Sequence, residues 1–183
     1  MRKVRTLLFV IVAVVGISVV GISAQNVGSN SIQSSTAIAQ KAYSKLRGLP
    51  RYGVFDNITV DVRGNTVILE GKVITLGTKS AAARAMKDIP GVAEVVNNIE
   101  ELPLGSFDNQ IRREAYRSFV TRGPGQYFHE LNPDVRIIVE NGRITLEGYV
   151  YRESDSNLLN ILANGVSGTF SVTNNLIVGK RIA

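Results

Sequence analysis

Few side chains in this sequence could carry out catalysis. His129 is the only histidine, and the chain of 183 residues contains no cysteine. A metal site of ordinary composition or a histidine-based catalytic triad would need partners that the sequence does not supply. Glu70 and Glu147 recur, but each lies between a leucine and a glycine in a strand-like segment, where we expect it to face solvent. The sequence therefore predicts a protein that is not an enzyme, with no metal site, no cofactor and no small-molecule substrate.

The clearest binding chemistry lies in one amphipathic segment near the middle of the chain. Arginine side chains there stand among apolar and aromatic ones, and the segment comprises Ile111, Arg112, Arg113, Tyr116, Arg117 and Phe119. Guanidinium groups bind phosphate bidentately, and aromatic rings are favoured at a bilayer interface. One interpretation is that these residues contact phospholipid. The alternative, which helical spacing favours, is that the apolar members face a core and the arginines are solvated.

Net charge says little about the partner. The formal charge of +6 falls to +3 when Arg2, Lys3 and Arg5 at the start of the chain are set aside. An excess this small does not indicate binding to a polyanion. We therefore expect no nucleic-acid partner.

The elements that would position these residues occur twice. The segment from Ile58 to Leu102 aligns without a gap on the segment from Val135 to Gly179. Leu-Glu-Gly-x-Val and Val-x-Asn-Asn fall at equivalent places in both segments, and the alternating apolar positions coincide as well. Internal duplication is the simplest explanation.

Each copy predicts the same order of elements. Alternating apolar residues indicate two strands, joined by the turn Gly64-Asn65 in the first copy and by Asn141-Gly142 in the second. A helix is predicted over Ser80–Ile89 and over Ser154–Asn164, each followed by a third strand, and a further amphipathic helix opens each copy. The predicted fold class is α+β, with two tandem α-β-β-α-β modules, each a three-stranded mixed sheet covered by two helices. One module of about 70 residues would be marginal alone, so we expect the modules to pack together.

Four glycines recur at equivalent positions of the two copies: Gly71, Gly91, Gly148 and Gly168. A glycine on the inner face of a strand usually marks a bulge or the close approach of a packed helix. We interpret these glycines as structural positions and not as ligand sites.

This order of elements, with Leu-Glu-Gly-x-Val and Val-x-Asn-Asn at fixed places, resembles the BON domain, which occurs in tandem in osmotically induced and outer-membrane-associated periplasmic proteins. The resemblance covers Thr36 to Gly179. It implies a non-enzymatic protein that attaches to anionic phospholipid membrane surfaces or to envelope proteins. The alternative function is a periplasmic scaffold module that binds another protein or peptidoglycan. Many members with two such domains carry a lipidated cysteine, which this chain lacks.

The predicted organisation begins with a signal peptide over residues 1–24. A basic start precedes the apolar run Leu7–Ile22, and Ser23-Ala24 supplies small residues for cleavage. An uncleaved membrane anchor is the alternative interpretation of this run. We expect a linker over 25–35, the first module over 36–103 and the second over 104–180. The expected location is the periplasm, without lipid attachment because cysteine is absent.

Overall fold

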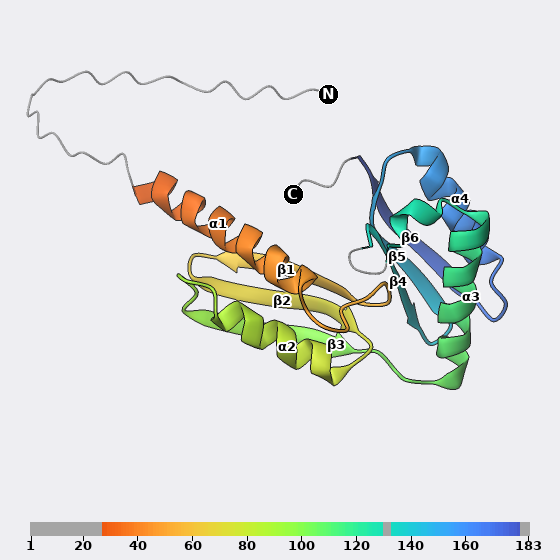
Figure 1. Ribbon diagram of the computed structural model, residues 1–183, viewed down its shortest axis with the longest axis horizontal. Helices are drawn as coiled ribbons and strands as arrows, with labels where there is room; N and C mark the ends of the chain where they lie inside the picture. Colours follow the sequence, from red (N-terminus) through yellow and green to blue (C-terminus); the bar gives the residue numbers. More distant parts are fainter. Residues whose placement is uncertain (1–26, 130–132, 180–183) are drawn as a thin grey trace, which may run out of the picture.

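The structure, a computed structural model, describes residues 27–129 and 133–179, with side chains from Ser35 onward. Two modules follow one another, and each has the order helix, strand, strand, helix, strand. In each sheet the first two strands are antiparallel and the third runs parallel to the second. The two helices of each module contact each other and cover one face of its sheet (Figure 1). The predicted α+β fold with two α-β-β-α-β modules is confirmed.

The first module consists of α1 (Val27–Arg47), β1 (Asn57–Arg63), β2 (Thr66–Val73), α2 (Leu76–Lys87) and β3 (Glu94–Glu101). The second consists of α3 (Ser106–Arg122), the short 3-10 helix η1 (Gly125–Tyr127), β4 (Val135–Glu140), β5 (Arg143–Val150), α4 (Glu153–Asn164) and β6 (Ser171–Val178). The order of strands in the two sheets is β1-β2-β3 and β4-β5-β6. Each sheet therefore has its duplicated Leu-Glu-Gly strand in the centre.

Two helices begin earlier than the sequence predicts. α1 begins at Val27, so most of the stretch expected to be a linker is helical, because a helix that has formed gains one hydrogen bond for each residue added. α2 begins at Leu76 and not at Ser80, because the Thr75 hydroxyl accepts a hydrogen bond from the backbone N–H of Thr78 at 3.3 Å and caps the helix. No helix among the described residues is long and apolar enough to cross a membrane. The predicted signal peptide lies outside the described residues.

Each module has its own apolar core between its helices and its sheet. In the first, α1 contributes Ile38, Ala42 and Leu46, which pack against inward side chains of β2. In the second, α3 contributes the equivalent residues of the duplicated helix, Ile111, Ala115 and Phe119. The turn between β4 and β5 has the geometry that its sequence indicates, because Asn141 and Gly142 adopt φ angles of 51° and 73°.

Gly71 and Gly148 hold equivalent positions in β2 and β5, with φ angles of 124° and 116°. A Cβ atom at Gly71 would overlap the carbonyl oxygen of Asn57, and one at Gly148 would overlap that of Asp134. The close neighbour is therefore the backbone at the start of the adjacent antiparallel strand, and not a packed helix, which was one of the two expected causes. The other recurring glycines, Gly91 and Gly168, also have positive φ angles, of 95° and 84°.

The loop between α1 and β1 joins the two modules. The backbone N–H of Ile137 donates to the carbonyl oxygen of Val54 at 2.8 Å, and Arg136 Nη1 donates to that of Gly53 at 2.6 Å. The Arg136 guanidinium also lies 4.3 Å from the centre of the Tyr52 ring. Because β4 is an edge strand, this loop covers backbone groups that would otherwise be open to another chain. All residues of β4 except the last are buried.

Candidate functional site

The structure separates the six residues of the amphipathic segment into two groups. The buried or half-buried ones are Ile111, Arg112, Tyr116 and Phe119, and the exposed ones are Arg113 and Arg117. The division follows the helical period, which places residues three or four apart on one face of α3. Arg113 and Arg117 are therefore the members of this set that a membrane surface could reach.

The aromatic members of the segment lie in an apolar cluster. The Phe119 and Phe128 ring centres are 5.5 Å apart, and Tyr116 lies edge-on to Phe128 at 6.3 Å. Tyr116 is also edge-on to Phe55 at 6.2 Å, and Phe55 belongs to the loop of the first module that joins the modules. These rings therefore stabilise the core and the module contact, and they do not form an interfacial surface.

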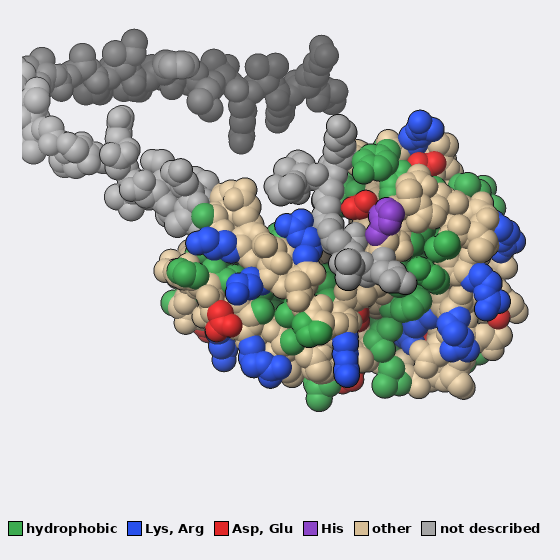
Figure 2. Space-filling model, in the orientation of Figure 1, with side chains coloured by type: hydrophobic (Ala, Val, Ile, Leu, Met, Phe, Trp, Pro, Cys, Tyr) green, Lys and Arg blue, Asp and Glu red, His purple; other side chains and the backbone are tan. Residues whose placement is uncertain are grey.

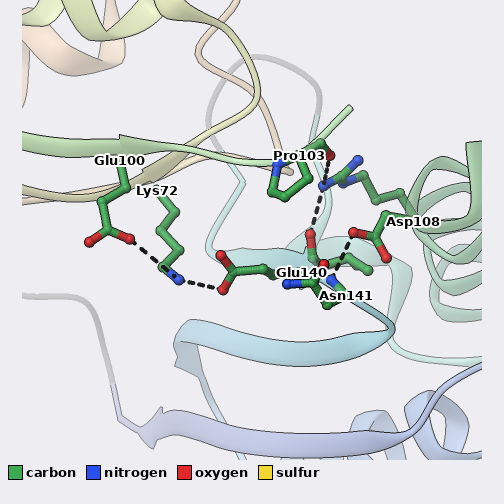
Figure 3. A network of polar contacts seen from close by, with 8 residues as sticks. Lys72, Glu100, Pro103, Asp108, Glu140 and Asn141 are labelled. Atoms are coloured by element: carbon green, nitrogen blue, oxygen red, sulfur yellow. Dashed lines mark hydrogen bonds and ion pairs between the residues drawn. The ribbon is translucent and has the colours of Figure 1, made fainter. Parts of the chain in front are cut away.

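Arg112 is 2% exposed and fixes the beginning of α3. Its Nη2 atom donates to the carbonyl oxygen of Pro103 at 3.4 Å (Figure 3) and to that of Val139 at 2.6 Å. Its Nη1 atom donates to Asn109 Oδ1 at 2.7 Å. These acceptors come from β4, from the segment between the modules and from α3 itself. Arg112 therefore joins three parts of the chain, and its guanidinium is not free to bind a phosphate group.

Asp108, one helical turn before Arg112, holds the turn between β4 and β5. One carboxylate oxygen accepts the backbone N–H of Asn141 at 2.8 Å (Figure 3), and the other accepts that of Gly142 at 2.8 Å. Burial lowers the pKa of Arg112, and the nearby charges of Asp108 and Asp56 oppose this effect. Buried polar groups thus set the orientation of α3 on its sheet, and with it the direction of its exposed side.

A second polar contact crosses the boundary between the modules close to this network. Lys72 Nζ on β2 donates to Glu140 at the end of β4 at 2.5 Å, and it lies 3.6 Å from Glu100 on β3 (Figure 3). The hydrogen bond to Glu140 raises the pKa of Lys72. This ion pair adds a charged contact to the junction that the α1–β1 loop makes.

The exposed side of α3 presents Arg113, Arg117 and Val120, which share the face opposite the core. Among the described residues, neither arginine takes part in an ion pair. Lys and Arg side chains are otherwise scattered over both modules in the view of Figure 2 and form no single block. The guanidinium groups on this face are therefore open to an external anion.

Arg117 also borders a shallow hollow of about 350 Å³ between α3 and the loop after α4. Arg122 and three hydroxyl-bearing residues line the same hollow: Ser118, Thr121 and Ser167. Arg122 Nη2 donates to Ser118 Oγ at 2.7 Å, which holds the guanidinium at the rim. Glu114 lies in the hollow too, where its charge opposes that of the arginines. Guanidinium and hydroxyl donors in a shallow site suit phosphate oxygens.

Two exposed rings, at the start of α3 and just before β6, were not anticipated from the sequence. Phe107 and Phe170 are 48% and 77% exposed, and their ring centres are 6.2 Å apart. The backbone N–H of Phe170 donates to the carbonyl oxygen of Gly142 at 2.8 Å, so its position is fixed by the sheet. The alignment of the two copies held the signal, because Phe170 stands where the first copy has Ala93. Paired exposed aromatics are a common feature of interfaces.

The recurring asparagines Asn97 and Asn174 hold each third strand to a helix. Asn97 Nδ2 donates to the carbonyl oxygen of Lys79 at 3.2 Å. Asn174 Nδ2 donates to Ser156, at 3.4 Å to the carbonyl oxygen and 2.9 Å to the hydroxyl. No cluster of three or more His, Cys, Asp or Glu residues in the described ranges could hold a metal ion.

A larger cleft, of about 580 Å³, lies between α1 and the open face of the second sheet. Tyr43 and Arg47 of α1 form one wall, and Glu147 and Tyr149 of β5 form part of the other. Arg47 makes no ion pair among the described residues. Because the walls belong to different modules, this cleft exists only when the modules are joined as they are here.

Comparison with known proteins identifies a domain family. The BON domain model matches residues 34–103 and again residues 108–180. A search of curated proteins gives no match. Two similar solved structures are of CdsD, a structural protein of the type III secretion system of Chlamydia trachomatis. One, of its C-terminal domain, has 14% identity and a TM-score of 0.32 over 79% of this chain and 67% of that one. The other has 12% identity and a TM-score of 0.30 over 79% of this chain and 94% of that one.

The two matches to the family model together span most of the chain, and they coincide with the two structural modules. The duplicated Leu-Glu-Gly strand, the paired asparagines and the α-β-β-α-β order all fall inside the matched ranges. The chain belongs to the BON domain family, with two copies of the domain in tandem.

Proposed function

We propose that this chain is a non-enzymatic binding protein of the cell envelope that attaches to anionic phospholipid through the exposed side of α3. The observation that carries the proposal is the pair Arg113 and Arg117, exposed on one face of the second BON domain and free of ion pairs among the described residues. Family membership supports an envelope role in general. The buried members of the amphipathic segment, Ile111, Arg112 and Phe119, hold α3 against its sheet on the opposite side of the helix.

The chemistry of the α3 surface fits a phospholipid headgroup. Guanidinium groups form charge-assisted hydrogen bonds with phosphate oxygens, and Arg117 shares a hollow with Arg122 and three hydroxyl groups. Phe107 and Phe170, at the start of α3 and just before β6, offer exposed aromatic rings that can enter the boundary between headgroups and acyl chains. The surface thus combines a charged contact with a shallow apolar one.

Co-sedimentation with vesicles tests this proposal. We expect binding to phosphatidylglycerol vesicles and much weaker binding to phosphatidylcholine vesicles. Each basic residue near an anionic surface contributes about 1 kcal/mol. The double variant Arg113→Gln/Arg117→Gln should therefore bind about 30-fold more weakly, which corresponds to about 2 kcal/mol. Added salt should weaken binding by the parent, because charges are screened over about 10 Å at 0.1 M.

The matched control is Lys41→Gln/Lys45→Gln, which removes two exposed cations from α1. It changes the net charge by the same amount, so a purely non-specific attraction would weaken equally in both variants. Arg112 is left intact in this test, because its removal would disturb the fold. Equal vesicle binding by the parent and the Arg113/Arg117 variant, with both folded by circular dichroism, would contradict the proposal.

The second candidate function is a periplasmic scaffold module for another envelope protein or peptidoglycan. The cleft between α1 and the second sheet favours it, because Arg47 and Glu147 offer opposite charges beside Tyr43 and Tyr149. Binding that is independent of lipid and lost in Arg47→Ala would support this function over the first. Soluble peptidoglycan fragments and envelope extract are the two probes to compare.

For location, we propose export by the predicted signal peptide and release into the periplasm without lipid attachment. The basic start, the apolar run Leu7–Ile22 and the absence of cysteine support this. N-terminal sequencing of the protein from a bacterial host should find a start close to Gln25. Membrane-bound protein that retains Met1 would favour the uncleaved anchor.

A further inference from the structure

The two copies differ sharply in charge over one continuous stretch. Residues 156–179 contain no charged side chain. The equivalent residues of the first copy, 79–102, contain charges of both signs: Lys79, Arg84, Lys87, Asp88, Glu94, Glu100 and Glu101. Duplicated segments with the same fold need the same core, so a difference confined to charge concerns the surface. The second copy has lost the charges that keep such a surface solvated.

In the structure the uncharged stretch forms most of α4 and all of β6, which pack against each other. Ile161 on α4 is 66% exposed, and Ile177 and Val178 on β6 are 54% and 51% exposed. Ile161 stands where the first copy has Arg84, and Ile177 stands where it has Glu100. Branched apolar side chains thus replace charged ones at exposed positions of both elements, with Ile161 on the helix side of the sheet and Ile177 on its open face.

β6 is also the edge of its sheet. Among the described residues it pairs with β5 alone, so its outer backbone groups have no strand partner. Proteins protect such edges with charged side chains or by covering them, because an open edge pairs with other strands. Each of the other three edges is protected here. The α1–β1 loop covers β4, Asp61 and Arg63 lie on β1, and three glutamates lie on β3.

We propose that β6 is a pairing edge for a second copy of this chain, with the two β6 strands antiparallel about a two-fold axis. This joins the second sheets of two copies into one continuous sheet and places the two α4 helices on the same face of it. An uncharged edge suits pairing with its own copy, because equivalent residues meet near the axis and like charges there would repel. The three glutamates of β3 would produce that repulsion at the first domain's edge.

The molar mass in solution tests the proposal. All 183 residues should be expressed in a bacterial host, so that any processing by the host takes place. The purified protein is then measured by sedimentation equilibrium over a range of concentrations. We expect a dimer for the parent. The variant Ile177→Glu/Val178→Glu places carboxylates on β6 where the first copy has Glu100 and Glu101, and it should be monomeric. The matched control Leu76→Glu charges an equally exposed apolar residue of the first domain and should stay dimeric.

Single cysteines give a second readout, because the chain has none of its own. Each residue of β6, from Ser171 to Val178, is replaced by cysteine in turn. In a symmetric antiparallel pair only the residue at the two-fold axis lies opposite its own copy, so one of the eight positions should form a disulfide-linked dimer far faster than the rest. No preference among the eight positions would overturn the pairing.

Three further outcomes bear on the pairing of β6. A parent that is monomeric at every concentration would overturn the proposal. So would a dimer that survives the Ile177→Glu/Val178→Glu variant. A monomeric parent whose binding to anionic vesicles is lost in Ile161→Arg would instead assign the uncharged surface to the membrane.

Discussion

Replacing Gly148 by alanine is a strong test of the backbone geometry, because only one methyl group is added. The φ angle of 116° at this position is one that residues with a Cβ rarely adopt, which costs about 1–3 kcal/mol. The new Cβ would also overlap the carbonyl oxygen of Asp134, and crowding of this kind costs about 1–3 kcal/mol more. We therefore expect Gly148→Ala to lower the free energy of unfolding by about 2–6 kcal/mol.

Two other glycines separate the cost of a positive φ angle from the cost of the close backbone approach. Gly64 has a φ angle of 61° and open space around it, so Gly64→Ala should cost only the backbone strain, about 1–2 kcal/mol. Gly105 has open space and an ordinary φ angle of −74°, so Gly105→Ala should change stability little. The free energy of unfolding is measured by urea denaturation followed by circular dichroism. Should Gly148→Ala prove no less stable than Gly64→Ala, the argument from close backbone approach would be refuted.

Three further predictions concern the polar groups at the junction of the domains. Arg112→Met should lower the free energy of unfolding by about 1–3 kcal/mol in urea, because buried oxygens lose their donors; an unchanged midpoint would contradict this. Burial raises the pKa of Asp56, so the folded state binds its proton more tightly than the unfolded state does. The free energy of unfolding of the parent should fall as pH rises from the ordinary pKa of 3.8 through the raised pKa, and Asp56→Asn should lack this fall. If the free energies of unfolding of the parent and Asp56→Asn changed in parallel with pH, this prediction would be wrong. Glu140→Gln should return the pKa of Lys72 toward its ordinary value, as observed by NMR titration of the side chain.

Local signals account for what the sequence predicted well. The alternation of apolar residues and the Asn141-Gly142 turn specify each hairpin within a few residues, and the repetition of the pattern confirmed the order of elements. The early start of α2 was also within reach, because Thr75 is a good N-cap residue. Family membership followed from the same repeated motifs.

Contacts between distant parts of the chain account for what the sequence did not predict. Arg112 and Arg113 are adjacent and chemically identical, and the acceptors that hold Arg112, the carbonyl oxygens of Val139 and Pro103, come from other parts of the chain. Tyr116 is covered by Phe55, which belongs to the other domain. The helical period showed which residues of α3 share a face, but the acceptors and rings that meet them are set by tertiary structure.

The most direct test of the proposed function is to map where an anionic bilayer touches the protein. NMR spectra of the chain with phosphatidylglycerol nanodiscs that carry a paramagnetic headgroup report which backbone amides come close to the lipid. The account predicts signal loss at Phe107, Arg113, Arg117 and Phe170, and none at Lys41 on α1. Signal loss centred on α1, or none above the level seen with phosphatidylcholine nanodiscs, would contradict it.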